Sequence, residues 1–192
     1  APFFLAERYK KIKFKYLNGS FQQQNKNIAL TTLKILKKFN LIKINKSRIM
    51  TGIKKARWKG RLEFLSKNVL VDCAHNPSGF KALKKELAII KKQRKIKNFI
   101  FVVGILKDKD VAAILRIINP LISKIIFTKP KNERASDTGD LLKIFDEINK
   151  NKEAKTRRID NPKKALKYAK KISNKSDLVV ATGSIYMVGE II

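Results

Sequence analysis

The chain has 192 residues and a formal net charge of +30, with 45 lysine and arginine residues against 15 acidic ones. This length suffices for one substantial core, or for one domain and part of another. A single cysteine, Cys73, excludes an internal disulfide and a multi-thiolate metal site. No run approaches the roughly 20 apolar residues of a membrane span, and the first residues lack a signal-peptide pattern. We therefore expect a cytoplasmic protein without a membrane partner.

The positive charge makes nucleic-acid binding the first function to consider, because neutralisation of phosphates drives such association. Only nine of the 45 basic residues are arginine, whereas phosphate and base recognition favours the arginine fork. The lysines are also spread through every segment and accompany abundant isoleucine and asparagine. We interpret them as a compositional bias on solvated helix faces and expect no specific nucleic-acid partner. A basic nucleic-acid-binding module stays as an alternative.

The first segments predict a small helical region. Residues 1–16 mix aromatic side chains and lysines without a clear period, so we expect an irregular or short helical segment. After a turn at 17–21, a helix starts near Gln22 and Asn25, with apolar residues at helical spacing. These two side-chain amides could hydrogen-bond to the edge of a base such as adenine, or only cap the helix and bond to the turn. A second short helix is predicted with Ser47 as its N-cap.

A linker at residues 56–60, Ala-Arg-Trp-Lys-Gly, marks the expected domain boundary. We predict one domain over residues 1–59 and a second over residues 60–192. The glycine before Arg61 gives a flexible backbone, and the arginine supplies a planar cation free to reach a phosphate. The alternative is a surface arginine, with Trp58 as a hydrophobic anchor.

From residue 62 onward, short β-branched runs alternate with amphipathic segments. Strands are predicted at 62–65, 69–73, 99–103, 124–128, 156–159 and 178–181, and helices at 78–92, 108–118, 137–149, 162–172 and from 184. Strands separated by helices of this size predict right-handed crossovers and a largely parallel sheet covered on both faces. The expected fold class is therefore α/β, a doubly wound and Rossmann-like domain.

The stretch at 69–77, Val-Leu-Val-Asp-Cys-Ala-His-Asn-Pro, predicts a buried strand, a tight turn and a helix start. In open α/β sheets ligands bind beyond the carboxyl ends of the strands, where Asp72 and His75 fall. A carboxylate accepts hydrogen bonds from sugar hydroxyls, while an imidazole and a helix N-terminus suit phosphate oxygens. The alternative is local, with Asn76 as N-cap, Pro77 as first helical residue and Asp72 holding backbone donors.

Two further strand ends belong to the same edge. The stretch at 104–110 follows a strand and starts a helix, so Asp108 can cap that helix and Gly104 can permit the turn. The stretch Ala-Thr-Gly-Ser at 181–184 has the same arrangement, and its hydroxyls and backbone donors could hold an anion. Ser184 is therefore a candidate substrate residue, with an N-cap role as the alternative.

Taken in order, these motifs resemble the C-terminal part of folylpolyglutamate synthase and dihydrofolate synthase, members of the Mur ligase superfamily. The resemblance covers nearly the whole chain, and Asp-x-Ala-His-Asn-Pro is its most specific part. The motifs are Gly19-Ser20-Phe21-Gln22 with Asn25, Trp58-Lys59-Gly60-Arg61, Asp72-Cys73-Ala74-His75-Asn76-Pro77, Gly104 with Asp108-Lys109-Asp110, and Gly183-Ser184.

The resemblance implies an ATP-dependent amide ligase. Such an enzyme phosphorylates the carboxylate of folate or dihydropteroate, and the amino group of L-glutamate attacks the acyl phosphate. Residues 1–59 would then be a helical remnant of the central ATPase domain, and the rest a C-terminal ligase domain like that of the Mur ligases. Position by position, the resemblance implies that Asn25 contacts adenine, Arg61 the phosphates, Asp72 the ribose and His75 the phosphate end of the site.

Departures from the family pattern limit this interpretation. The chain has no Gly-x-x-x-x-Gly-Lys-Ser/Thr phosphate loop and no G-x-G-x-x-G fingerprint. In the family that loop and the Mg2+ ligands lie in the N-terminal part, so we expect a C-terminal portion without its own catalytic residue or metal ligand, monomeric and inactive alone. Cys73 replaces a frequent glycine and Phe21 a histidine, and neither swap removes a proposed ligand. The alternative is a Mur-type ligase acting on another carboxylic acid.

Overall fold

The computed structural model describes residues 2–150 and 154–192. The chain divides into two compact units, an N-terminal unit of residues 1–59 and a C-terminal unit of residues 60–192. Each unit is described by itself. Within the described residues, no helix has the length and apolar character needed to cross a membrane.

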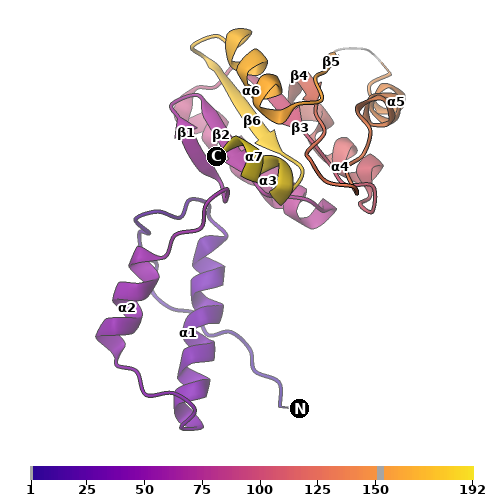
Figure 1. The fold of residues 1–192 in the computed structure, drawn as a ribbon. Coiled ribbons are helices and arrows are strands. Elements are labelled where there is room, and N and C mark those ends of the chain that lie inside the picture. The colour runs from indigo at the N-terminus through magenta and orange to yellow at the C-terminus, as the bar shows by residue number, and fades with distance from the viewer. Residues whose placement is uncertain (1, 151–153) are drawn as a thin grey trace. The chain divides into compact units, whose positions relative to one another are not determined.

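The N-terminal unit contains two helices, α1 (Gln22–Lys38) and α2 (Lys46–Lys55), drawn in indigo and purple in Figure 1. Asn45 is the N-cap of α2, because its side-chain oxygen accepts a hydrogen bond from Arg48 N at 2.8 Å. The prediction of Ser47 as N-cap is therefore wrong. Asparagine and serine cap helices about equally well, so residue type alone did not decide between Asn45 and Ser47.

Residues 2–16 contain no helix, and part of this segment is held along α1 by polar side chains. Gln23, Lys26 and Thr31 bond to backbone groups of residues 7–12, including Lys26 Nζ to the Lys10 carbonyl oxygen at 2.6 Å. Lys26 is buried, and these carbonyl oxygens replace the water that its ammonium group loses. The segment is therefore fixed to the helix mainly through side-chain to backbone hydrogen bonds.

The C-terminal unit alternates strands and helices as predicted, and the α/β fold class is confirmed (Figure 1). Among the residues that the structure describes in this unit, six strands form one sheet in the order β1-β2-β6-β3-β4-β5, in which only the pair β1 and β2 is antiparallel. The elements are β1 (Glu63–Ser66), β2 (Val69–Asp72), α3 (Pro77–Arg94), β3 (Asn98–Val103), α4 (Val111–Ile118), the 3-10 turn η1 (Asn119–Leu121), β4 (Ile122–Phe127), α5 (Thr138–Ile148), β5 (Lys155–Arg158), α6 (Pro162–Lys171), β6 (Asp177–Thr182) and α7 (Ile185–Ile191).

Helices cover both faces of this sheet, because successive strand residues point to opposite sides. Helices α3, α4 and α5 pack on one face around large side chains such as Phe80, Phe101 and Phe127. Helices α6 and α7 pack on the other face, where α6 contributes the small residues Ala165 and Ala169. From β2 the chain passes to β3, β4 and β5, with α3, α4 and α5 on the first face of the sheet. It then returns to β6 through α6 on the other face, so the topology is doubly wound.

Two loops at the carboxyl edge of the sheet meet at Gly183. This glycine has φ +120°, and a Cβ atom there would lie 2.6 Å from the carbonyl oxygen of Gly104. Both the backbone conformation and the close approach therefore require glycine. The contact brings the loop after β6 against the loop after β3.

Gly183→Ala should destabilise the C-terminal unit by about 2 kcal/mol or more, because backbone strain and overpacking each cost about 1–3 kcal/mol. Gly189→Ala is the matched control, since Gly189 is an exposed residue of α7 and an added methyl group there would meet no atom outside its own helix turn. The control should be neutral or slightly stabilising. Urea unfolding measures both variants, and equal midpoints would contradict the requirement for glycine at position 183.

Candidate functional site

The carboxyl end of β2 carries a buried aspartate. Asp72 is the last residue of β2 and is 7% exposed. One carboxylate oxygen accepts a hydrogen bond from Leu62 N, and the other accepts one from Ala74 N, both at 2.9 Å. A single side chain thus ties the segment before β1 to the turn after β2. The local interpretation, in which Asp72 holds backbone donors, is confirmed.

The segment 60–62 approaches this turn closely. Cys73 N donates a hydrogen bond to the Gly60 carbonyl oxygen at 2.8 Å. Gly60 has φ +72°, and a Cβ atom there would lie 2.8 Å from Cys73 Sγ. Leu62 is buried with φ +45°, a region that a branched side chain rarely adopts. Strained backbone of this kind clusters at functional sites, and here it presents the exposed Arg61 beside Asp72.

Electrostatics couple the charged groups at this edge. Burial raises the pKa of the Asp72 carboxyl, against the opposing effect of its two backbone hydrogen bonds and of the charges on Arg61 and His75. Burial also raises the pKa of the Cys73 thiol to about 11, so this thiol stays protonated near neutral pH. Cys73 therefore acts as a small packing residue and not as a nucleophile.

His75 is exposed at the start of the turn into α3. Its Nδ1 lies 3.0 Å from the Cys73 carbonyl oxygen. Because a carbonyl oxygen only accepts, this hydrogen bond places the proton on Nδ1 and leaves Nε2 for a ligand. Asn76 caps α3 by accepting from Gly79 N at 2.7 Å, and Pro77 is the first helical residue. The predicted cap is confirmed, and it sets the N-terminus of α3 beside His75.

The next loops along this edge are linked in the order of the strands. Gly183 N donates to the Ala74 carbonyl oxygen at 3.1 Å, and Gly104 N donates to the Thr182 carbonyl oxygen at 3.2 Å. Ser184 is 1% exposed, and its hydroxyl oxygen accepts from the backbone N–H of residue 187 at 3.0 Å as the N-cap of α7. The cap role of Ser184 is confirmed, and its contact with substrate stays a prediction.

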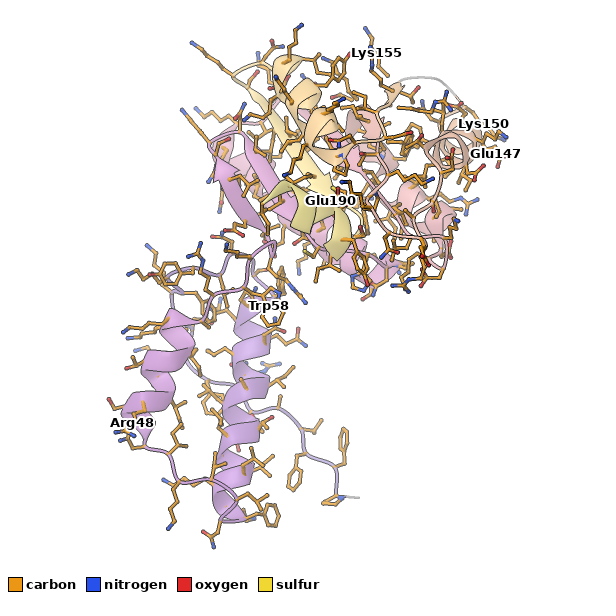
Figure 2. The ribbon with its side chains drawn as sticks, viewed as in Figure 1. Arg48, Trp58, Glu147, Lys150, Lys155 and Glu190 are labelled. Carbon is orange, nitrogen blue, oxygen red and sulfur yellow. The ribbon has the colours of Figure 1, made fainter. Side chains whose placement is uncertain are left out.

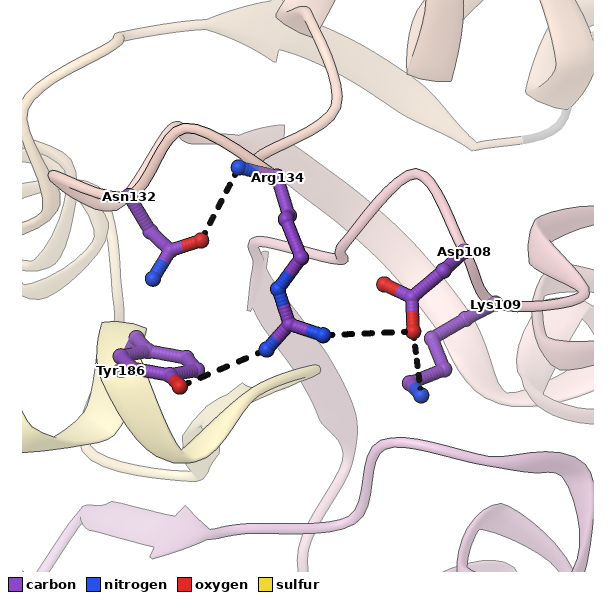
Figure 3. Close-up of polar contacts among 5 residues, drawn as sticks. All are labelled: Asp108, Lys109, Asn132, Arg134 and Tyr186. Atoms are coloured by element: carbon purple, nitrogen blue, oxygen red, sulfur yellow. Dashed lines mark hydrogen bonds and ion pairs between the residues drawn. The ribbon is translucent and has the colours of Figure 1, made fainter.

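A polar cluster lies further along the edge, between the loops after β3 and β4 and helix α7 (Figure 3). One oxygen of Asp108 lies 2.7 Å from Lys109 Nζ and 3.6 Å from Arg134 Nη1. The Arg134 guanidinium also donates to the Tyr186 hydroxyl at 3.4 Å, and Arg134 N donates to Asn132 Oδ1 at 3.0 Å. Hydrogen bonding to Lys109 lowers the pKa of Asp108. Arg134, in the loop after β4, thereby links this loop to the loop after β3 and to helix α7.

Asp108 does not cap α4, contrary to the sequence expectation. Asp110 is the cap, and its side chain accepts from Ala113 N at 2.9 Å. The helix begins three residues later than predicted, which frees Asp108 for Lys109 and Arg134. Sequence reasoning missed Arg134, and the only available signal was an arginine inside the polar loop at 129–136.

The structure thus places the predicted residues in two groups. Arg61, Asp72 and His75 come together at the carboxyl end of β2, with the Ser184 loop bonded to the same turn. Asn25 belongs to the N-terminal unit, where it is exposed in the first turn of α1 and its Nδ2 donates to Gln22 Oε1 at 3.0 Å.

The alternative for the linker was a surface arginine with Trp58 as a hydrophobic anchor. Arg61 does lie at the surface. The side chain of Trp58, labelled in Figure 2, is 63% exposed. It is therefore not a buried hydrophobic anchor for this segment. Within residues 2–150 and 154–192, no group of three or more histidine, cysteine or acidic residues could hold a metal ion.

A strand-end carboxylate, an imidazole beside a helix N-terminus and an adjacent arginine define a site suited to a sugar phosphate. The family model described as Mur ligase, glutamate ligase domain, matches residues 60–185. The chain belongs to the Mur ligase family.

Two curated relatives are named after folate enzymes. The dihydrofolate synthase/folylpolyglutamate synthase of Bacillus subtilis is 29% identical over 178 residues, which cover 91% of this chain and 39% of that relative. The folylpolyglutamate synthase of Lacticaseibacillus casei is 35% identical over 99 residues, covering 50% of this chain and 22% of the relative. The chain therefore spans well under half the length of these proteins.

Solved structures agree with the fold. The folylpolyglutamate synthase of Mycobacterium tuberculosis complexed with ADP is 25% identical, with a TM-score of 0.75 over 90% of this chain and 39% of that structure. E. coli FolC in complex with DHPP and ADP is 23% identical, with a TM-score of 0.74 over 88% of this chain and 38% of that structure. The resemblance to folylpolyglutamate and dihydrofolate synthases and the Mur-type fold are confirmed.

The buried carboxyl of Asp72 should make the free energy of unfolding depend on pH. Because burial raises its pKa in the folded state, the folded protein binds this proton more tightly than the unfolded chain. The resulting stability is complete below the unfolded pKa of about 4 and is lost as pH rises through the folded pKa. Wild type should therefore lose stability relative to Asp72→Asn as pH rises above about 4. Urea unfolding at a series of pH values measures the free energy of unfolding of wild type minus that of Asp72→Asn. This quantity should fall as pH rises, and a value that stays constant or increases with pH would contradict the prediction.

Proposed function

We propose that this chain is the C-terminal portion of an ATP-dependent ligase that joins L-glutamate to folate or dihydropteroate through an acyl phosphate. The observation that carries the proposal is the convergence of Arg61, Asp72 and His75 at the carboxyl end of β2. The chain's membership of the Mur ligase family and the names of its relatives support the reaction class and substrates.

Arg61 contributes a mobile cation for the transferring phosphate. Its guanidinium is exposed, while the backbone on both sides of it is fixed by Gly60, Cys73 and Asp72. A guanidinium on a fixed backbone can follow the charge that develops on phosphoryl oxygens and donate to two of them. Such a contact strengthens as the phosphate moves toward the transition state.

Asp72 and His75 contribute binding of the nucleotide. The two backbone hydrogen bonds of Asp72 use one acceptor direction on each oxygen, and an ionised carboxylate has about four such directions. The remaining directions suit the hydroxyls of a ribose. His75 keeps Nε2 for the phosphate end of the nucleotide, next to the N-terminus of α3.

Asn25 contributes the contact with adenine, from the N-terminal unit. Its carboxamide lies in the first turn of α1 and offers one donor and one acceptor side by side. Ser184 is the weaker candidate, for the carboxylate substrate, because its hydroxyl oxygen already serves as an N-cap.

Magnesium and the phosphate loop belong to the part of the ligase that this chain does not span. A divalent cation would neutralise phosphate charge during transfer. The protein that carries these residues is proposed to act as a monomer in the cytoplasm, with folate or dihydropteroate, L-glutamate and ATP as its small-molecule partners. A Mur-type ligase for another carboxylic acid is the second candidate, and the family model alone is compatible with it.

Arg61→Ala should lower kcat strongly in a longer ligase that contains this chain, because the contact acts mainly in the transition state. Asp72→Ala should chiefly raise the KM for ATP, by about 10-fold to 150-fold for a charge-assisted hydrogen bond of about 1.5–3 kcal/mol. Lys59→Ala is the matched control, since Lys59 is an exposed cation two residues from Arg61.

Steady-state kinetics with circular dichroism as a folding check would measure these constants. If Arg61→Ala left kcat and KM within about twofold of wild type, as Lys59→Ala should, Arg61 would be a surface residue without a role in the reaction. The nucleotide site would then have to lie away from the segment 60–62.

The 192-residue chain alone should not catalyse ligation. Without the phosphate loop and its cation, the terminal phosphoryl group has neither positioning nor charge neutralisation. The assay is release of phosphate by the purified chain in the presence of ATP, Mg2+, L-glutamate and either folate or dihydropteroate. Release that requires both ATP and L-glutamate would refute this prediction.

A further inference from the structure

The first turn of α1 contains a hydrogen-bonded pair of side-chain amides. Gln22 and Asn25 are three residues apart and therefore lie on the same side of the helix. Asn25 Nδ2 donates to Gln22 Oε1 at 3.0 Å. Gln22 is 5% exposed, whereas Asn25 is exposed. The buried Gln22 thus accepts a hydrogen bond from one of the two amide protons of the exposed Asn25.

The backbone before α1 sets the place of Gln22. Gly19 has φ +103°, and a Cβ atom there would lie 2.5 Å from the ring of Phe21. Gln22 N donates to the Gly19 carbonyl oxygen at 3.2 Å, which closes the turn. The helix start is therefore fixed by the turn, and Phe21, at the N-cap position, makes no side-chain capping bond. The side chain of Gln22 is buried at this helix start, and its amide oxygen accepts from Asn25.

We infer that Gln22 orients the carboxamide of Asn25 and thereby determines the preference for adenine over guanine. This inference rests on the proposed contact between Asn25 and the base of ATP. With one Nδ2 proton held by Gln22, Asn25 presents its carbonyl oxygen and its second proton outward. If the Asn25 amide turned over, two oxygen acceptors would face each other at about hydrogen-bond distance.

The presented pattern matches one purine. Adenine offers an amino donor at N6 beside an acceptor at N7, so the oxygen and the second proton of Asn25 pair with both. Guanine offers two acceptors, O6 and N7, on the same edge. The oxygen of an oriented Asn25 would then face O6 without a proton between them. Gln22 is in this sense a positioning residue that acts through Asn25.

Three variants of Gln22 and its neighbour test the inference. Gln22→Met removes the amide oxygen but retains the length of the side chain, so the orientation of Asn25 is lost. Gln22→Glu has only acceptor oxygens in its ionised form, so it still accepts the Asn25 proton. Gln24→Met is the matched control, because Gln24 lies in the same turn of α1 and is exposed.

The measurement is the 15N NMR signal of the Asn25 side-chain amide in the 192-residue chain, with ATP and GTP as probes. Without nucleotide, the two Asn25 protons should be well separated in wild type and in Gln22→Glu, and should converge in Gln22→Met. Titration should give a preference for ATP that Asn25→Ala reduces by about 5-fold to 150-fold. Gln22→Met should reduce it at least about 5-fold, while Gln22→Glu and Gln24→Met stay within about twofold.

The outcomes separate this inference from the proposed function. If Asn25→Ala removes the preference for ATP but Gln22→Met leaves it, the role of Gln22 is wrong and the adenine contact stands. Loss of the preference in Gln22→Glu would mean that Gln22 donates to Asn25, which also overturns the inference. If Asn25→Ala leaves the preference unchanged, or wild type has none, the adenine contact of the proposed function fails as well. Amide dispersion in the NMR spectra confirms that each variant is folded.

Discussion

The carboxylate of Asp72 is the interaction on which the candidate site depends. Its two oxygens accept the backbone N–H groups of Leu62 and Ala74, ten residues and two residues away. These bonds hold the strained segment before β1 against the turn after β2, and so bring Arg61 and His75 to one edge. A buried carboxylate is costly unless its oxygens are hydrogen-bonded, and here two backbone groups offset part of that cost. The same contact that stabilises the turn therefore arranges the charges around it.

The remainder of the edge is built on that turn. Backbone hydrogen bonds connect the loops after β2, β6 and β3 in the order of the strands, through Ala74, Gly183, Thr182 and Gly104. The loop after β4 continues the series through the hydrogen bond from Lys107 N to the carbonyl oxygen of residue 134. Because the strands beneath are buried between two helical layers, the edge stands on a rigid support. A ligand site on such a support requires only small movements of exposed side chains such as that of Arg61.

Sequence predicted most features that depend on neighbouring residues, apart from the caps at Asn45 and Asp110, but not those that depend on distant residues. The strands and helices of the C-terminal unit follow from apolar periodicity, and the caps at Asn76 and Ser184 follow from local turn chemistry. The bond from Leu62 to Asp72 and the link from Arg134 to Tyr186 join residues that only the completed sheet brings together. Position in the sequence indicated a site at the end of β2, while the distant partner of its carboxylate, Leu62 N, came from tertiary structure. The ligand roles themselves stay predictions.

We propose above all that the carboxyl end of β2 binds the phosphates and ribose of a nucleotide. Hydrogen–deuterium exchange of the 192-residue chain with and without ATP, at physiological salt, tests it most directly. We expect slower exchange at residues 60–62 and 72–77, and no such effect with ATP on a chain carrying Arg61→Ala and His75→Ala. Protection confined to the lysine-rich outer surfaces of α3 and α6, and lost as salt rises, would contradict the account, because it would identify unspecific binding of anions by the basic surface.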